Sequence, residues 1–152
     1  MRDEACVKWF LEHGADPNVR NEKGITVLAT AALHPSITIL ELLLFHGAEV
    51  DPEALYSAIT RRGQGGVPVM RFLIDHGIDV NSPSKQWGTP LSYAVRIADR
   101  EKVKLLVESG ADRTVRNSIG QTLAEQAKSI GHEELCELLG DQFQALLYYR
   151  IP

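Results

Sequence analysis

Three histidines of this chain stand directly before a glycine, and the imidazole ring is the commonest metal ligand in proteins. They are His13, His46 and His76, and their glycines belong to a series with steps of 33, 30 and 33 residues: Gly14, Gly47, Gly77 and Gly110. A nearly constant period of this length is typical of stacked copies of one unit. Equivalent residues in such a stack lie roughly 10 Å apart, whereas the ligands of a zinc ion all lie ~2.0–2.2 Å from it. We therefore expect these histidines to end helices, and we expect no metal site.

The other reactive side chains form no catalytic pattern. Cys6 and Cys136 would lie at opposite ends of a stack, too far apart for a disulfide, whose Cα atoms stand within ~7 Å. We expect both cysteines to be core residues of helices. The glycine-rich segment 62–66 follows a predicted helix rather than a strand and contains no lysine, unlike a phosphate-binding loop. The sequence thus predicts no catalytic residue, no cofactor and no enzyme activity.

The composition is that of an ordinary soluble domain. The chain has 152 residues, of which 44% are hydrophobic and 24% charged, with a net charge of −4. An acidic balance argues against nucleic acid as a partner, because nucleic-acid binding uses a basic surface. No apolar run reaches the ~18 residues that a membrane span needs, and the first residues do not form a signal peptide. Reduced cysteines suit a cytoplasmic or nuclear protein.

Helical periodicity recurs within each copy. A first helix presents apolar residues three positions apart, at Leu28/Ala31, Leu91/Ala94 and Ala124/Ala127. A second amphipathic helix follows and ends at the repeated glycine, which suits the left-handed position after a helix. The expected N-caps are Thr26, Thr89, Thr122 and Asp99, and Glu125 completes a capping box with Thr122.

Four segments resemble the ankyrin repeat: Thr89-Pro90-Leu91, the His-Gly-Ala-Asp series that starts at His13, Asp79-Val80-Asn81, and Gly131-His132-Glu133-Glu134. The resemblance covers residues 1 to about 142. It implies an all-α solenoid of stacked antiparallel helix pairs with projecting hairpin loops (the fingers). It also implies binding of a protein partner through the fingers and the concave surface of the first helices. The histidine of the family's Thr-Pro-Leu-His element is absent, and its positions hold Ala29, Tyr56, Ser92 and Glu125.

The repeats are unequal. The pattern predicts one domain with a half repeat at 1–23, repeats at about 24–50, 51–86, 87–119 and 120–142, and a C-terminal capping tail at 143–152. The tail is apolar enough that its alternative role is to dock onto a partner. The half repeat lacks a first helix, so we expect exposed apolar surface there, with Trp9 involved. The link 49–52 has lost about six residues, which should remove one finger and start a helix at Asp51-Pro52-Glu53.

The candidate functional residues are contact residues. Trp87 lies close to Lys85 and stands where the family has a small residue, and an exposed tryptophan near a lysine is typical of a binding hot spot. The alternative is that Trp87 folds back onto its neighbour. Tyr56 borders the missing finger, and we expect it to face the concave side together with Ser92 and Arg96. The remaining candidates lie on the fingers: Arg20, Lys23, Arg116 and Asn117. For Arg20, Lys23 and Lys85 the alternative is a solvated finger tip with no contact to a partner.

The sequence therefore predicts a non-enzymatic protein–protein interaction module, whose rigid surface loses little entropy on binding. One alternative is a fragment of a larger multidomain protein whose exposed ends mediate self-association, as a homodimer through the N-terminal half repeat or the C-terminal tail. Another is a substrate of an asparagine hydroxylase. Some ankyrin proteins that resemble this one are hydroxylated on the corresponding asparagine, here Asn18 or Asn81.

Overall fold

The structure, a computed structural model, describes residues 2–61 and 65–140. The predicted tail 143–152 lies outside these residues, as does most of the glycine-rich segment 62–66. The chain forms two compact units, residues 1–79 and 80–152, and each is built from packed helices. Within the described residues the extended chain forms isolated bridges and no β-strand, so the fold is all-α, as expected.

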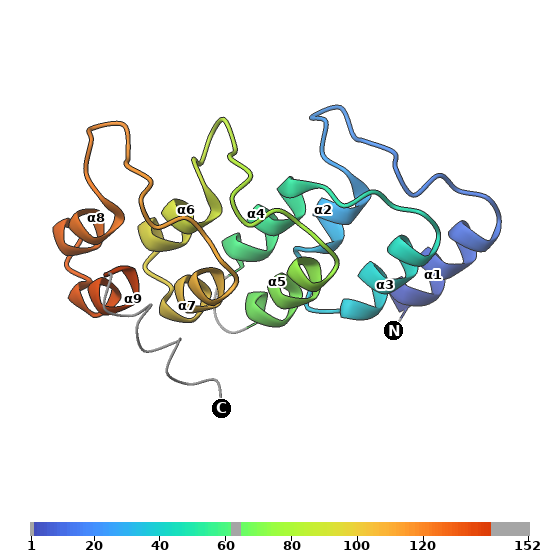
Figure 1. Cartoon of the computed structure of the whole chain (residues 1–152). Helices are drawn as coiled ribbons and strands as arrows, with labels where there is room; N and C mark the ends of the chain where they lie inside the picture. The colour runs from blue at the N-terminus through green and yellow to red at the C-terminus, as the bar shows by residue number, and fades with distance from the viewer. Residues whose placement is uncertain (1, 62–64, 141–152) are drawn as a thin grey trace. The chain divides into compact units, whose positions relative to one another are not determined.

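The first unit consists of helix pairs preceded by a single helix. Its helices are α1 (Arg2–Glu12), α2 (Val27–Ala31), α3 (Ile37–Phe45), α4 (Pro52–Thr60) and α5 (Gly66–Asp75). Helix α2 packs on α3, α4 packs on α5, and α2 packs on α4 in turn (Figure 1). Leu28, Leu40, Leu55 and Met70 form part of the core, and each is at most 1% exposed.

The second unit repeats the same arrangement. Its helices are α6 (Pro90–Arg96), α7 (Arg100–Glu108), α8 (Leu123–Ser129), the 3-10 helix η1 (Glu133–Leu135) and α9 (Cys136–Leu139). Helix α6 packs on α7 and α8, and α8 packs on α9 (Figure 1). The core residues Leu91, Leu106, Leu123 and Leu135 are again at most 1% exposed. These core residues thus face inward in both units.

Local side-chain hydrogen bonds start the helices as the sequence predicts. Thr26 Oγ1 accepts from the backbone N–H of residue 29 at 3.0 Å, and Thr122 and Glu125 form the reciprocal capping box. Asp51 and Asp99 cap α4 and α7 with their carboxylates. Each cap satisfies a backbone N–H that has no partner inside the helix.

The repeated glycines end helices in the left-handed region. Gly14, Gly47, Gly77 and Gly110 have φ between 85° and 91°, a conformation that only glycine adopts without strain. The ring Nδ1 of His13 lies 2.7 Å from the carbonyl oxygen of Trp9. A carbonyl oxygen only accepts, so this nitrogen carries the proton. The predicted helix-end position of the histidines is therefore confirmed.

Hairpin fingers project before α2, α6 and α8 (Figure 1). Their bases are bridged at Arg20 and Thr26 in the first unit, and at Ser84 and Gly88 and at Arg116 and Thr122 in the second. Residues 46–51 connect α3 directly to α4, and no bridge is described between them. The shortened link thus removes a finger, as the sequence predicts.

The N-terminal helix departs from one expectation. Cys6 is exposed, although the helical pattern predicts a core position for it. The reason is that the described residues contain no short helix paired with α1, so this side of α1 is uncovered. Trp9 and Phe10, 54% and 58% exposed, confirm the expected apolar surface at this end.

Candidate protein-binding surface

Two of the predicted finger residues hold their own loops together. Arg20 Nη1 donates to the carbonyl oxygen of Gly24 at 2.9 Å in the first unit, and Arg116 Nη1 donates to the carbonyl oxygen of Gly120 at 2.7 Å in the second. Arg20 also lies 3.4 Å from the Asp51 carboxylate, which ties this finger to the start of α4. Both arginines therefore have a structural role in addition to any contact with a partner.

The asparagines that follow these arginines fold the tips of the same fingers. Asn117 Oδ1 accepts hydrogen bonds from the backbone N–H groups of Ile119 and Gln121 at 3.1 and 3.0 Å. Asn21 Oδ1 does the same for residues 23 and 25. Asparagine is favoured in turns because its side chain can replace a backbone acceptor. Lys23 is exposed at the first of these tips.

The finger before α6 is built differently. Pro83 stands where the other fingers have their arginine, six residues before the capping threonine, and Trp87 replaces the glycine. The Trp87 ring packs back onto Tyr93 of α6, with a centroid distance of 5.0 Å. The Arg96 guanidinium lies 5.0 Å from the centroids of both rings. Of the two alternatives for Trp87, packing on a neighbour is what the structure shows, but the ring stays only half-buried.

This cluster leaves polar donors available. Among the residues that the structure describes, no oxygen accepts a hydrogen bond from the Arg96 guanidinium or the Trp87 indole nitrogen. Arg96 is exposed, as is Lys85 on the same finger. We call Lys85, Trp87 and Arg96 the Trp87 surface; Tyr93 supports it from below and is itself only 7% exposed. A guanidinium that lies over two aromatic rings has lost much of its conformational freedom before any partner arrives.

Two further residues near α6 complete the description of this surface. Ser92 is half-buried and its hydroxyl donates to the carbonyl oxygen of Thr89 at 2.9 Å, so it is engaged locally. Tyr93 is not among the residues that the sequence singles out. The sequence could have pointed to Tyr93 through its spacing of three residues from Arg96, because residues three apart lie on the same face of a helix.

Tyr56 needs a correction. The sequence predicts that it faces the concave side, but its side chain is 3% exposed in the core of the first unit. The large ring lies between packed helices at a position where other repeats hold a small or polar residue. A side chain so covered offers no contact area to a partner, and we exclude Tyr56 from the candidate surface.

Asn18 and Asn81 connect neighbouring repeats in their respective units. Asn18 Nδ2 donates to the carbonyl oxygen of Gly47 at 2.9 Å, and Asn18 Oδ1 accepts from the backbone N–H of Glu49 at 2.7 Å. Asn81 makes the equivalent bonds to Gly110 and Asp112, at 3.4 and 2.7 Å. Both amides are therefore engaged in the folded chain.

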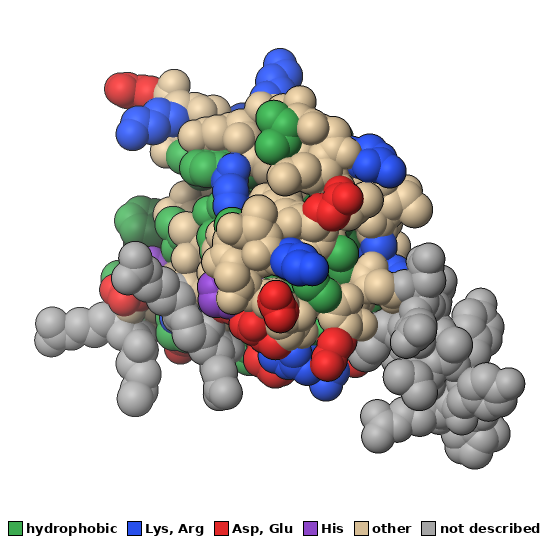
Figure 2. All heavy atoms as spheres, turned by 90° about the vertical axis from the view of Figure 1, so that its left-hand side faces the viewer, with side chains coloured by type: hydrophobic (Ala, Val, Ile, Leu, Met, Phe, Trp, Pro, Cys, Tyr) green, Lys and Arg blue, Asp and Glu red, His purple; other side chains and the backbone are tan. Residues whose placement is uncertain are grey.

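The surface charges are mixed. Figure 2, which views the side of the molecule where α8 and α9 lie in Figure 1, shows acidic and basic side chains interspersed with hydrophobic ones.

Hydrogen bonds from Thr122 lower the pKa of Glu125, and those from Thr114 lower the pKa of Asp112. A hydrogen bond from His132 likewise lowers the pKa of Glu134. These carboxylates stabilise loops and caps.

Two other classes of site receive no support from the described part of the chain. No group of three or more histidine, cysteine, aspartate or glutamate side chains in that part could hold a metal ion. None of the helices described there is long and apolar enough to cross a membrane.

Comparison with known proteins agrees with this geometry. Residues 2–84 match the family described as ankyrin repeats in three copies, and residues 88–118 match a single ankyrin repeat. An ankyrin repeat protein of fowlpox virus is 30% identical over 142 residues, which are 89% of this chain and 32% of that protein. An ankyrin repeat-containing protein of Treponema pallidum is 29% identical over 138 residues, 88% of this chain and 46% of that protein.

A third relative covers a shorter part of the chain. The ankyrin repeat and SOCS box protein 11 of Danio rerio is 39% identical over 101 residues, 62% of this chain and 33% of that protein. The chain thus spans about a third to a half of the length of these relatives. Ankyrin repeats are generally non-enzymatic modules that bind other proteins. The helix pairs, the fingers and the matched residues together show that this chain belongs to the ankyrin repeat family.

Proposed function

We propose that the chain is a non-enzymatic protein-binding module whose partner contacts the Trp87 surface of the second unit. The observation that carries this proposal is the packing of Trp87, Tyr93 and Arg96, with mutual distances of 5.0 Å and with unused donors on Trp87 and Arg96. Tryptophan and arginine dominate binding hot spots, where a fixed side chain loses little entropy on association. Lys85 adds a positive charge on the same finger.

The finger residues of the first unit are secondary contacts in this proposal. Arg20 and Asn21 are occupied in holding their loop, whereas the Lys23 side chain at the tip is exposed and has no described partner. An exposed lysine contributes little binding energy by itself. Arg116 and Asn117 play the same supporting role for the last finger. Removing any one of their side chains would chiefly alter the shape of a loop.

The test begins with affinity capture of a partner from a native lysate, followed by calorimetry with the purified partner. Trp87→Ala is expected to weaken binding by about 2 kcal/mol or more, which is roughly a 30-fold rise in Kd. Arg96→Gln should weaken it as well, because the variant keeps polarity but loses the guanidinium. Phe45→Ala is the matched control, since Phe45 is an aromatic residue of the first unit that is 85% exposed.

Circular dichroism of each variant separates loss of binding from loss of structure. An unchanged affinity for both Trp87→Ala and Arg96→Gln would exclude the Trp87 surface as the binding site. Equal weakening by Phe45→Ala would point to a contact on the first unit instead. We further propose an intracellular protein, because Cys6 and Cys136 both carry free thiols.

Self-association through the N-terminal helix is a second candidate function, favoured by the exposure of Trp9 and Phe10. Modification by an asparagine hydroxylase is a third. Because Asn18 and Asn81 both donate and accept hydrogen bonds in the folded chain, modification would require the fingers to open locally. Intact-mass analysis of protein made in its native host tests the third candidate, and an unmodified mass would count against it.

A further inference from the structure

Arg96 differs from the arginines that hold the fold together. The guanidinium groups of those others each donate to a backbone carbonyl oxygen, at distances from 2.6 to 2.9 Å: Arg20, Arg61, Arg100, Arg113 and Arg116. Arg96 is exposed, and no described oxygen accepts a hydrogen bond from it. Its guanidinium lies 5.0 Å from the ring centroids of Trp87 and Tyr93. The rings therefore hold this side chain in place while its N–H groups stay open to a partner.

The acidic residue nearest to Arg96 along the chain is already occupied. Asp99 follows three residues after Arg96, and its Oδ2 atom lies 2.8 Å from Nζ of the buried Lys102. Its Oδ1 atom accepts a hydrogen bond from the backbone N–H of Lys102 at 3.3 Å. The described part of the chain thus supplies no anion to Arg96, and an anionic group of a partner can take that place.

The fingers and first helices of the second unit carry an excess of positive charge. Residues 83–96 and 116–129 contain Lys85, Arg96, Arg116 and Lys128. Glu125 is the one acidic residue in these two ranges, and the capping box of α8 holds it in place. These elements therefore attract an acidic segment, although the chain as a whole has a net charge of −4.

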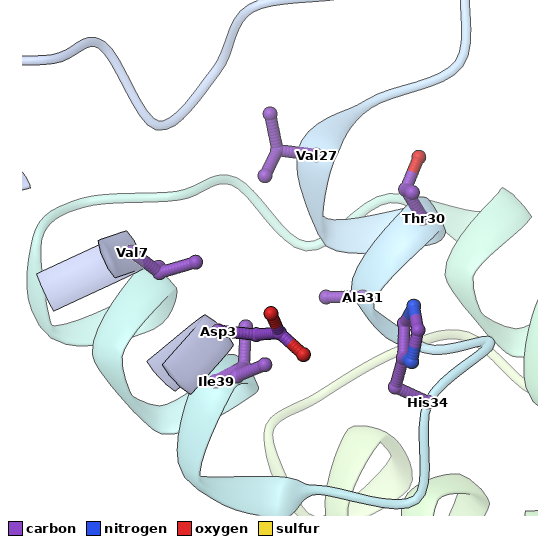
Figure 3. Close-up of a pocket in the computed structure, with 7 residues that line it drawn as sticks. All are labelled: Asp3, Val7, Val27, Thr30, Ala31, His34 and Ile39. Carbon is purple, nitrogen blue, oxygen red and sulfur yellow. The ribbon is translucent and has the colours of Figure 1, made fainter. Parts of the chain in front are cut away.

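The first unit contains a hollow of the opposite charge. A pocket of about 210 Å³ is lined mainly by apolar side chains, which include Val7, Val27 and Ile39. Figure 3 shows the Asp3 carboxylate pointing into the pocket among these side chains. The described residues that line the pocket include no lysine or arginine. Because Asp3 repels a carboxylate and Arg96 attracts one, the Trp87 surface is the better match of the two for an acidic partner.

The charges of the Trp87 surface suit a carboxylate better than a phosphate. A guanidinium presents two parallel N–H groups that match the two oxygens of a carboxylate. A phosphate carries nearly two negative charges and is usually bound by a cluster of arginines. Here one arginine lies over the Trp87 and Tyr93 rings, and Lys85 lies exposed on the same finger as Trp87. One fixed guanidinium with one mobile ammonium matches a single carboxylate.

We propose that the Trp87 surface binds an acidic peptide segment of its partner. In this complex an aspartate or glutamate carboxylate accepts hydrogen bonds from the Arg96 guanidinium, and a neighbouring side chain of the segment packs on the Trp87 ring. Lys85 adds a second attraction for the same negative charge. This inference rests on the proposed function, because it names the chemistry of the partner at the same surface.

Selection from a library of random peptides tests whether the segment is acidic. Peptides of about 12 residues, long enough to span one finger and its helix in extended form, are selected on the whole chain in a Trp9→Phe background, in which Trp87 is the one remaining tryptophan. We expect the selected peptides to be enriched in aspartate or glutamate and to change the fluorescence of Trp87. Peptides that Trp87→Ala releases but that show no acidic enrichment would overturn this inference and leave the proposed function intact. A selection that yields no peptide dependent on Trp87 would overturn the inference together with the proposed binding site.

Synthetic copies of a selected peptide test the pairing with Arg96. Replacing its acidic residue with glutamine should raise Kd about 10-fold or more, and Arg96→Gln should do the same. The two changes together should cost little more than either alone, because both remove the same hydrogen bonds. Fully additive effects would overturn the pairing of this carboxylate with Arg96.

Arg71→Gln is the matched control for the loss of charge. Arg71 is an exposed arginine of α5 that has no described partner and lies over no described ring. Its removal should change Kd less than about twofold, because an isolated surface charge contributes little. Weakening equal to that of Arg96→Gln would show that net charge alone attracts the peptide, and would overturn the assignment to Arg96.

A peptide with phosphoserine in place of the acidic residue distinguishes the two anions. We expect it to bind about as tightly as the carboxylate peptide, since only one fixed guanidinium is present to receive the additional charge. A phosphoserine peptide that binds about 10-fold tighter or more would overturn the assignment to a carboxylate. Circular dichroism of every variant shows whether the helices are retained.

Discussion

A buried lysine in the second unit provides a quantitative test of the packing. Lys102 lies on α7 at a position that is Val69 in α5, and it is 0% exposed. Its Nζ atom lies 2.8 Å from Asp99 Oδ2, and the Asp99 side chain is 24% exposed. Asp99 also caps α7 through the backbone N–H of Lys102 at 3.3 Å. One carboxylate thus performs two functions, and substitutions can separate them.

The expected free energies follow from the burial of the pair. Asp99→Ser keeps a capping oxygen but removes the charge. Loss of one partner of a buried pair costs about 3–5 kcal/mol, and because Asp99 is partly solvated we expect about 2 kcal/mol. Lys102→Met replaces the buried ammonium group with a flexible apolar side chain of similar length. We therefore expect the free energy of unfolding to stay unchanged or to rise by about 1 kcal/mol. In the Lys102→Met background, Asp99→Ser should cost less than about 0.5 kcal/mol, since serine and aspartate cap equally well.

Urea unfolding followed by circular dichroism measures this double-mutant cycle. With a slope of about 2 kcal/mol/M, a loss of 2 kcal/mol lowers the midpoint by about 1 M. Lys104→Met on the same helix is the control, because Lys104 is exposed and surface changes stay within about 0.5 kcal/mol. The reasoning is refuted if Asp99→Ser is harmless while Lys102→Met destabilises the fold, since the ammonium would then not depend on the carboxylate.

Three further predictions concern the repeats. Asn81→Ala should lower the free energy of unfolding by about 1–3 kcal/mol, because it leaves two backbone groups of the next repeat unpaired; urea unfolding measures this, and a loss below a few tenths would contradict it. Gly110→Ala should cost about 1–2 kcal/mol, because φ is 87° there, and the thermal midpoint should fall. Hydrogen bonds from Thr122 lower the pKa of Glu125 below 4.5. The ionised Glu125 carboxylate therefore stabilises the folded chain above pH 4.5, and this contribution is lost as the pH falls through the folded-state pKa. Glu125→Gln should flatten that part of the stability–pH curve, and an unchanged curve would exclude the capping box as its cause.

Much of the local structure follows from the sequence alone. The capping threonines, the capping box of Thr122 and the left-handed glycines all depend on residues within four positions of one another, so a single chain segment contains the whole cause. The missing finger before α4 is equally local, because residues 46–51 are too few to form a hairpin. The period near 33 then indicates that these segments stack, since no unit could bury its apolar side alone.

The tertiary structure decided which of the repeated positions face solvent. Tyr56 is buried and Cys6 is exposed, although the sequence predicts the opposite environment for each. Trp87 could project or fold back, and only the neighbouring Tyr93 and Arg96 decide that it folds back. A repeat pattern fixes the direction of each side chain on its own helix. Whether a neighbour covers that side chain depends on which helices pack against it, and those contacts join residues far apart along the chain.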